Sequence, residues 1–435
     1  MRIQNIAEAG SLDGVFGDGG IVSINIPGAL LVRIESIHSV GAGPDRKIYF
    51  AGMYFGAPEG QFYFLGRLNS DGSFDNTFGD AGNNGVITGS FQGHESTITS
   101  LVILSDGKIL VYGYASSSEF LNAPALARFE TNGTLDRSFG DDGTCVHDID
   151  LQPPANAVYP DEPQSNDNSN SSPYGVEILP DGKILISKHY AFGFGPSMGL
   201  IVRLCENGSL DLTFNQIGYI TVIHPQYLLT NTQLMNIMVQ PDGMYLGCGA
   251  VWDRDKPHCA MFVRFDNEGK LDKSFGDGGF ALQAPRDGDG LRVALMALQS
   301  DNRILGIGNT VKTDMRAMLM SIKPDGTPDT RFNGGLPLYT SIEESLTAWT
   351  GGAIQTDGKI VVVGAAASAK YEFDIVVARF NDKGFDPAFG GKGWVRTHVG
   401  EGAQEATGMT LQDDGKIVVS AFTQRPEALI LRYNA

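Results

Sequence analysis

The side chains suited to chemistry are scattered through this sequence rather than gathered in a motif. Seven histidines are present, at His38, His94, His147, His189, His224, His258 and His398. His94, His224 and His398 fall near predicted connections between repeats, where three imidazoles could together hold a transition metal. No HxH or HExxH spacing supports that hypothesis. The sequence therefore favours solvated or hydrogen-bonded surface histidines.

The acidic and thiol groups suggest two further sites, both of which the sequence disfavours. Asp287 and Asp289 belong to a DGDG stretch that resembles part of a calcium loop, but residues 291–296 supply no closing Glu. A plain turn is the favoured interpretation. The four cysteines form no CxxC pair, and a disulfide between Cys248 and Cys259 across a hairpin is the weaker alternative to free buried thiols.

Aromatic residues gather in the variable loops, and these are our candidates for ligand binding. Rings that converge on one rim suit stacking on a sugar or gripping a peptide. The alternative is that the rings pack against one another and hold long loops in place. The candidate ligand-binding residues are Tyr54, Phe55, Tyr190, Phe192, Trp252 and Tyr371.

Several function classes are excluded or disfavoured. No GxSxG elbow, P-loop, Rossmann fingerprint or zinc-protease motif is present, so we assign no catalytic residue, metal or cofactor. The net charge of −18, from 32 basic and 50 acidic residues, disfavours nucleic acid and anionic membranes as partners. We find no secretory signal and no apolar run long enough to span a membrane, which predicts a cytoplasmic chain or one exported without a signal peptide.

The elements that must position these side chains come from an internal repeat. One marker is the Asp of a PDGK-like turn, and the other is the Phe of a GxLDxxFG pattern. Successive Phe markers are 62, 61, 75, 61, 57 and 57 residues apart. They are Phe16, Phe78, Phe139, Phe214, Phe275, Phe332 and Phe389. Two markers that keep the same spacing establish a true repeat.

Each repeat contains four short β-rich runs separated by DG or NG dipeptides, which predicts antiparallel hairpins. Seven such units predict an all-β fold, a seven-bladed β-propeller of four-stranded blades in one domain over 1–435. The chain begins with a fourth strand and ends with a third. We therefore predict that 21–26 pairs with 428–433 and completes the last blade, which removes unpaired edges.

Within each blade we assign the strand before the PDGK turn as innermost. The PDGK and FGDGG turns then share one face, and the variable loops lie on the other. In the fourth full period, Leu271 and Phe275 are predicted to bury the third connection against the blade. The repeated Asp of LDxxFG is predicted to cap a local turn, because one active site does not need seven copies.

The copies GSLDGVFGDGG, GSFDNTFGDAG, GTLDRSFGDDG and GKLDKSFGDGG, alternating with PDGKIL-like turns, resemble the delta-sixty repeat family of bacterial β-propellers. The resemblance covers nearly the whole chain and implies the propeller fold. It implies no defined activity and no catalytic residues. Some copies depart from the pattern, including GPDRK at 43–47, DNR at 301–303 and Pro328 in place of Leu.

One insertion, 150–172, lengthens a single period and is rich in Pro, Asn and Ser. We predict a surface loop, with a lid or partner-binding loop as the alternative. The favoured function is a non-enzymatic, monomeric binding scaffold for a glycan or protein on the loop-rich face. The alternatives are a propeller hydrolase or lyase with a polar site at the channel mouth, and a structural module of a larger assembly.

Overall fold

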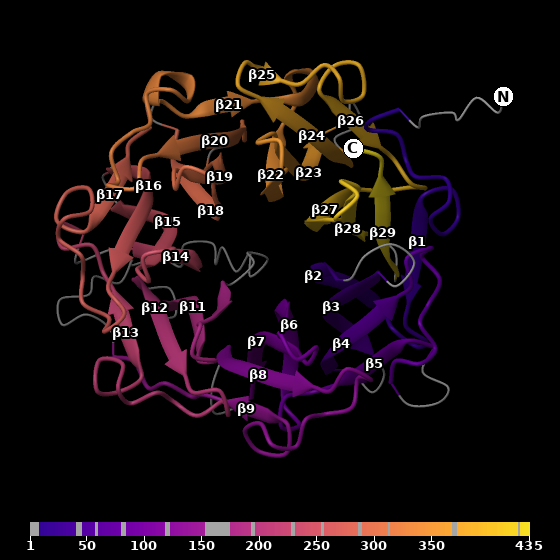
Figure 1. Cartoon of the computed structure of the whole chain (residues 1–435), viewed down its shortest axis with the longest axis horizontal. Helices are drawn as coiled ribbons and strands as arrows, with labels where there is room; N and C mark the ends of the chain where they lie inside the picture. The colour runs from indigo at the N-terminus through magenta and orange to yellow at the C-terminus, as the bar shows by residue number, and fades with distance from the viewer. Residues whose placement is uncertain are drawn as a thin grey trace. The chain divides into compact units, whose positions relative to one another are not determined.

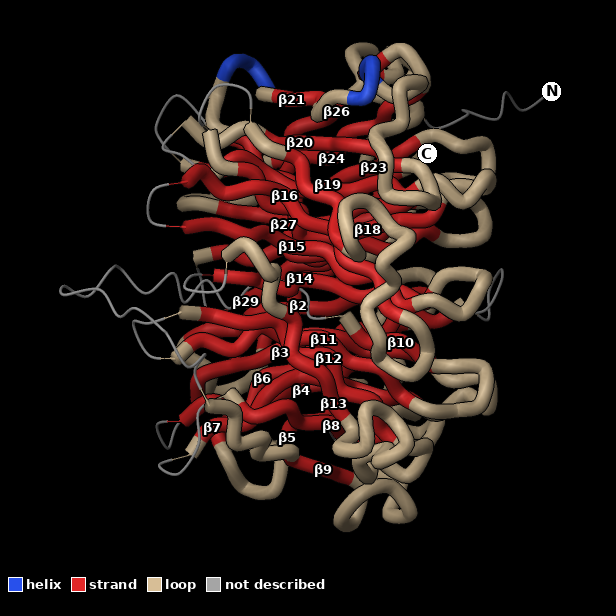
Figure 2. Tube along the Cα trace, turned by 90° about the vertical axis from the view of Figure 1, so that its left-hand side faces the viewer, coloured by secondary structure: helices blue, strands red, loops and turns tan. Residues whose placement is uncertain are grey.

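The computed structural model describes residues 8–40, 46–56, 60–79, 84–117, 122–152, 175–192, 196–227, 231–253, 256–285, 289–311, 314–367, 372–424 and 427–435, without the side chains of 38–40 and 256–257. The fold is all-β, with multiple four-stranded antiparallel sheets (Figure 1). Strands dominate the trace in Figure 2, which also shows two short 3-10 turns, η2 (Asn333–Gly335) and η3 (Ile342–Glu344).

Three four-stranded sheets follow the chain in order. They are β2 (Leu31–Val40), β3 (Lys47–Gly56), β4 (Gly60–Leu68) and β5 (Val86–Gly89), then β6 (Glu95–Ile103), β7 (Ile109–Ser116), β8 (Ala123–Phe129) and β9 (Thr144–Val146), then β18 (Leu291–Leu298), β19 (Ile304–Thr310), β20 (Ala317–Ile322) and β21 (Leu338–Thr340).

The remaining sheets vary this plan. An eight-stranded sheet comprises β10 (Val176–Ile178), β11 (Ile184–Ala191), β12 (Ser197–Leu204), β13 (Tyr219–Val222), β14 (Asn231–Val239), β15 (Tyr245–Asp253), β16 (Lys256–Phe265) and β17 (Phe280–Gln283). A five-stranded sheet comprises β22 (Thr347–Ile354), β23 (Ile360–Ala367), β24 (Phe373–Asn381), β25 (Gly384–Phe385) and β26 (Trp394–Thr397). The last sheet comprises β27 (Gln404–Leu411), β28 (Ile417–Thr423), β29 (Glu427–Tyr433) and β1 (Ile21–Asn25).

The two ends of the chain share this last sheet, as the sequence predicted. Strand β1 runs antiparallel to β29, with Ile21 opposite Leu431 and Asn25 opposite Glu427. In Figure 1 the indigo β1 lies beside the yellow β29. Val22 and Ile24 are buried there, so their alternation with polar neighbours fixes the register.

Hydrogen bonds to the Asp side chain close the PDGK-like turns. In the turn after β6, the Asp106 carboxylate accepts the Lys108 backbone N–H at 3.0 Å, which closes an Asx turn. The degenerate DNR copy keeps the same geometry, because Asn302 adopts the left-handed φ of 62° that glycine adopts in the other turns.

The first strand of several sheets contains a β-bulge, seen as a register shift in β2, β14, β18, β22 and β27. A glycine on the neighbouring strand faces four of these bulges, and Ala421 faces the bulge of β27. A Cβ on Gly249 would lie 1.8 Å from the Gln233 carbonyl oxygen, and one on Gly308 would lie 1.9 Å from that of Arg292. The close backbone therefore leaves no room for a side chain at Gly249 and Gly308.

The described chain divides into two compact units, one of 1–110, 129–134 and 341–435 and the other of 111–128 and 135–340. In the first, apolar side chains of β2–β4 pack against those of β1, β28 and β29. In the second, β11 and β12 pack against β14–β16, which pack in turn against β18–β20. Phe275 is fully buried and Leu271 is partly buried, which confirms the predicted role of Phe275.

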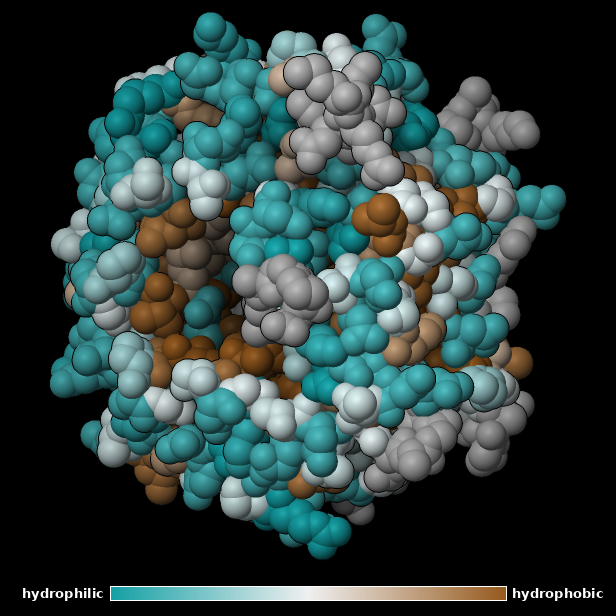
Figure 3. Space-filling model, turned by 45° about the vertical axis from the view of Figure 1, so that its right-hand side comes forward, coloured by the Kyte–Doolittle hydropathy of each residue, from teal (hydrophilic) through white to brown (hydrophobic). Residues whose placement is uncertain are grey.

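Polar groups dominate the surface. Hydrophilic side chains cover most of the face drawn in Figure 3, in keeping with the net charge of −18. Among the described residues, none of the helical segments has the length and hydropathy needed to cross a bilayer. Residues 153–172 of the predicted surface loop, Tyr371 and Asp287 lie outside the described residues.

Candidate functional site

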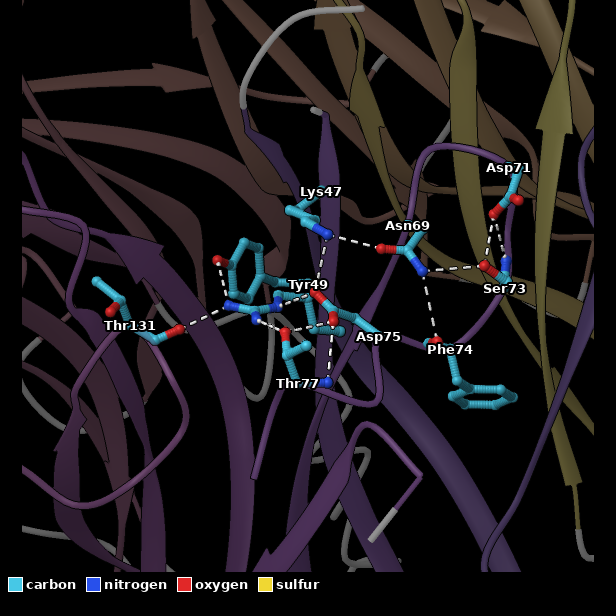
Figure 4. Close-up of polar contacts among 10 residues, drawn as sticks. Lys47, Tyr49, Asn69, Asp71, Ser73, Phe74, Asp75, Thr77 and Thr131 are labelled. Atoms are coloured by element: carbon cyan, nitrogen blue, oxygen red, sulfur yellow. Dashed lines mark hydrogen bonds and ion pairs between the residues drawn. The ribbon is translucent and has the colours of Figure 1, made fainter. Parts of the chain in front are cut away.

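The repeated Asp of the LDxxFG pattern forms a packing cluster (Figure 4). One oxygen of Asp75 accepts the Thr77 backbone N–H at 3.1 Å and its hydroxyl at 2.6 Å, so the predicted local cap is confirmed. The other oxygen pairs with Arg67 Nε at 2.9 Å and Lys47 Nζ at 2.9 Å. The sequence analysis missed this arginine, although it stands at a fixed distance of eight residues before Asp75.

The equivalent arginine of the following repeat, Arg128, links its own repeat to the next one. The Arg128 guanidinium lies 4.8 Å from the centroid of the Phe139 ring and donates at 2.7 Å to the Glu206 carbonyl oxygen of the following turn. Gly140 N donates to the neighbouring Asn207 carbonyl oxygen at 2.8 Å. These contacts join the LDxxFG turn of one repeat to the hairpin turn of the next.

These contacts set the protonation of the repeated Asp. Burial by itself would raise the pKa of Asp211, but hydrogen bonds from Thr213, Lys183 and Arg203 outweigh it and hold that pKa well below its ordinary value. The carboxylate is therefore charged at neutral pH. It cannot serve as a proton donor there.

The described candidate residues lie at the ends of the hairpins between second and third strands, and Tyr54, Tyr190, Phe192 and Trp252 contact a ring of the same hairpin. Tyr54 lies opposite Phe62 in the β3–β4 register, with ring centroids 5.6 Å apart. Phe55 beside it is 39% exposed. Trp252 stacks on His258 at 4.4 Å with an interplanar angle of 9°.

Among the described candidates, Tyr190 and Phe192 contact each other, with ring centroids 5.0 Å apart. Tyr54, Tyr190, Phe192 and Trp252 are all half-buried. The alternative prediction, that the rings pack against one another, therefore applies to these four residues.

A second polar group, which the sequence analysis did not identify, lies on the first strands β2 and β27. Arg33 Nε is 2.6 Å from the Glu35 carboxylate, and its guanidinium lies 5.3 Å from the Phe422 ring centroid. Burial raises the pKa of Glu35 to about 7, Arg33 opposes that shift, and the Glu405 carboxylate adds to it. With a pKa of about 7, the Glu35 carboxyl can gain or lose a proton at neutral pH.

Glu35 owes this position to the bulge in β2, since the register shift between Ile34 and Ser36 leaves it without a partner on β3. A bulge re-aims the side chain of its extra residue. The available signal was a charged residue inside the apolar run 31–37, but strand alternation alone would place it in solvent. The sequence could not place Glu405 beside it.

Two of the histidines predicted near connections between repeats, His398 and His224, are held by neighbouring groups. His398 follows β26, which pairs with β24 on the side opposite β22, the strand assigned as innermost. Its Nδ1 is 2.6 Å from the buried Asp374 carboxylate, whose other oxygen accepts from Arg396 at 2.8 Å. His224 packs edge-on against Phe280 at 4.6 Å, and its Nδ1 accepts the Gln226 backbone N–H at 3.2 Å. Both are hydrogen-bonded, but His224 is buried, so the prediction of a surface histidine is wrong for it.

The thiols and acids form no described metal site. The four cysteines are free, so the hairpin disulfide between Cys248 and Cys259 is not formed. Asp289 is buried and paired with Arg316. Within the described ranges, no group of three or more His, Cys, Asp or Glu is arranged to hold a metal ion.

Comparison with known proteins finds the repeat again. A family model described as "Domain of unknown function (DUF5122) beta-propeller" matches residues 43–78, 104–139, 179–214 and 355–384. These matches support a β-propeller family, whereas the narrower delta-sixty resemblance stays a prediction. No curated protein matches the chain.

Solved structures similar to this chain include a protein of unknown function from Dyadobacter fermentans, with 10% identity, TM-score 0.44, and coverage of 96% of this chain and 100% of that one. A putative oxidoreductase (glucose dehydrogenase) from Thermus thermophilus has 13% identity, TM-score 0.41, and coverage of 76% and 95%. The PQQ-bound aldose sugar dehydrogenase of Streptomyces coelicolor has 15% identity, TM-score 0.39, and coverage of 77% and 92%.

Proposed function

We propose that the chain forms a single seven-bladed β-propeller over 1–435, with β1 completing the last blade. The pairing of β1 with β29 supports the closure. The eight-stranded sheet divides naturally into two blades, because β12 and β14 are joined by one parallel residue pair, Ser197 with Asn231. Two blades from that sheet and one from each of the other five give seven.

We propose further that this propeller is a non-enzymatic scaffold that binds a glycan or protein on its loop-rich face. The observation that supports it is the half-buried ring pair at the hairpin end, seen at Tyr54–Phe62, Tyr190–Phe192 and Trp252–His258. Stacked or tilted pairs hold each ring rigid, which reduces the entropy lost when a sugar face stacks on it. The acidic surface supports a neutral or basic ligand, without nucleic acid.

Replacing Trp252 with alanine is expected to weaken glycan binding about threefold to tenfold, since one aromatic stacking contact is worth about 0.5–1.5 kcal/mol. A glycan array on the purified chain identifies the ligand, and calorimetry then compares the variants. Leu212→Ala is the matched control, because Leu212 is 64% exposed in a repeat turn away from the hairpin ends. Equal affinity of both variants, or an array without any bound glycan, would remove the glycan version.

A second function, acid–base cleavage of a glycan, is favoured by the Glu35 and Glu405 pair. A general acid needs a proton at working pH, and burial keeps one on Glu35 with a pKa of about 7. Arg33 beside it supplies a positive charge for an anionic group of the substrate. This arrangement corresponds to the hydrolase or lyase alternative.

Under this second function, Glu35→Gln should lower cleavage of a polysaccharide panel by about 100-fold or more, the usual contribution of a general acid. Its stability should not fall, because a carboxyl with a raised pKa costs stability as pH rises from about 4.5 to about 7, and glutamine removes that cost. Glu95→Gln, on an exposed side chain at the start of β6, is the control. A reducing-end assay measures the release of cleaved product. An inactive wild type or an active E35Q would reject this function.

A further inference from the structure

One repeat carries a long charged side chain where most repeats have the glycine described above. The glycine that faces the bulge stands seven residues after the Asp of each PDGK-like turn. Five copies have glycine there, one has Ala421 and one has Lys188. The five glycines are Gly52, Gly113, Gly249, Gly308 and Gly364.

The lysine cannot be a neutral replacement for the glycine. A Cβ on Gly52 would lie 1.9 Å from the Arg33 carbonyl oxygen, and one on Gly364 would lie 1.9 Å from that of Ala348. In the Lys188 repeat the first strand is described over Val176–Ile178 as β10, and Gly175 O accepts the Ser187 N–H at 2.9 Å.

The side chain of Lys188 is buried with an unusual lack of partners. It is 4% exposed, and its Nζ makes no hydrogen bond to any described residue. Burial lowers the pKa of this amine to about 7. Lys183, at the start of the same strand, provides the contrast, because Asp211 at 3.1 Å raises the pKa of its amine.

The aromatic pair of the same repeat, Tyr190 and Phe192, lies on the same face of the sheet as the Lys188 amine. The β11–β12 register runs without a shift from Ile184 to Ala191, so Lys188 and Tyr190 point to the same face of the sheet. Phe192 joins that face through its ring contact with Tyr190 at 5.0 Å. The half-buried rings thus lie between the amine and the end of the hairpin.

We propose that Lys188 is a nucleophilic amine that forms an imine with a small aromatic aldehyde guided by Tyr190 and Phe192. An uncharged amine has a free electron pair, and no carboxylate among the described residues holds it as an ammonium ion. A preference for an aromatic aldehyde follows from the two rings beside its path. This goes beyond the proposed scaffold and does not depend on glycan binding.

The reaction balances without any cofactor. The Nζ electron pair attacks the carbonyl carbon, the π electrons of the carbonyl move to its oxygen, and one amine proton moves from nitrogen to that oxygen. The carbon–oxygen bond then breaks, the second amine proton leaves with the oxygen as water, and a carbon–nitrogen double bond remains. Borohydride, supplied in the experiment, adds hydride to this bond and traps a stable secondary amine.

The test incubates the full chain with benzaldehyde and borohydride at pH 7 and maps the modified lysines by peptide mass spectrometry. Lys188 should be labelled at least about tenfold faster than Lys183, because about half of an amine with a pKa of 7 is neutral at that pH, against under 0.1% for an ordinary lysine. The labelling rate should rise with pH through a midpoint near 7. Lysine labelling no faster at 188 than at 183 would overturn the proposal.

Two variants separate reactivity from folding. Lys188→Met keeps the length of the side chain and should lose the label while Lys183 keeps its own rate. Lys188→Gly places the repeat's own residue there and serves if the methionine variant does not fold. Tyr190→Ala should slow labelling of Lys188 by benzaldehyde more than labelling by formaldehyde, which has no ring. An equal effect on both aldehydes would reject the guiding role of the rings.

Discussion

Replacing Arg203 with alanine is expected to lower the free energy of unfolding by about 3–5 kcal/mol, the cost of removing one partner of a buried ion pair. Arg203 and Asp211 are 7% and 3% exposed, with Nε and Oδ2 2.7 Å apart. The change leaves Asp211 charged and buried without its arginine. It also removes the guanidinium from the Phe214 ring, 4.6 Å away, and from the Asn267 carbonyl oxygen.

Urea unfolding monitored by fluorescence measures this change. The matched control is Arg137→Ala, since Arg137 belongs to the equivalent turn of the preceding repeat, is 81% exposed and lies 3.6 Å from Asp142. An exposed pair of this kind contributes about 0–1 kcal/mol. Similar losses in the two variants would contradict the view that the repeated arginine holds neighbouring turns together.

Lowering the pH should reproduce part of the loss of stability caused by Arg203→Ala. The pKa of Asp211 is lowered in the folded chain, so its carboxylate contributes stability above the unfolded pKa of about 3.9 and loses it as pH falls below that value. The difference in stability between wild type and Arg203→Ala should therefore shrink on acidification. Arg137→Ala should show no such pH dependence.

A chain that lacks residues 1–27 is expected to be about 5–8 kcal/mol less stable than the full chain, because Phe16, Val22 and Ile24 each contribute about 1.5–3 kcal/mol by burial. The deletion also removes Asp13, the partner of Arg432 at 2.7 Å. It exposes the edge of β29, so soluble aggregates should appear by light scattering.

A synthetic peptide of residues 8–27 added in trans should restore the stability and suppress aggregation. The same peptide with Ile24→Asp is the control, since it would place a charge at a fully buried position. Thermal unfolding of the truncated chain with each peptide is the measurement. A truncated chain that remains monomeric and as stable as the full chain would show that β1 is dispensable.

Much of the fold was predictable because its signals are local and repeated. The spacing of the Phe markers gave the strands and turns, and the incomplete ends of the sequence gave the pairing of 21–26 with the C-terminal strand, seen as Ile21 opposite Leu431. Asn302 shows why the degenerate copies did not upset the fold prediction, since asparagine tolerates the left-handed backbone of the turn.

The candidate sites were less predictable, because they depend on contacts between distant strands. Trp252 and Tyr190 were identified as aromatic loop residues, but their ring partners His258 and Phe192 could be assigned only from the hairpin register. Glu35 gains its raised pKa from burial and from Glu405, which stands 370 positions away in the sequence. No local pattern reports such a neighbour.

The union of head and tail in one sheet also bears on how the chain acquires its structure during synthesis. The Ser23 hydroxyl donates to the Glu427 carboxylate across 404 positions, so the segment around Ser23 must remain unpaired until the segment around Glu427 has been synthesised. Contacts of such high sequence separation slow folding and prolong exposure of the nascent strand.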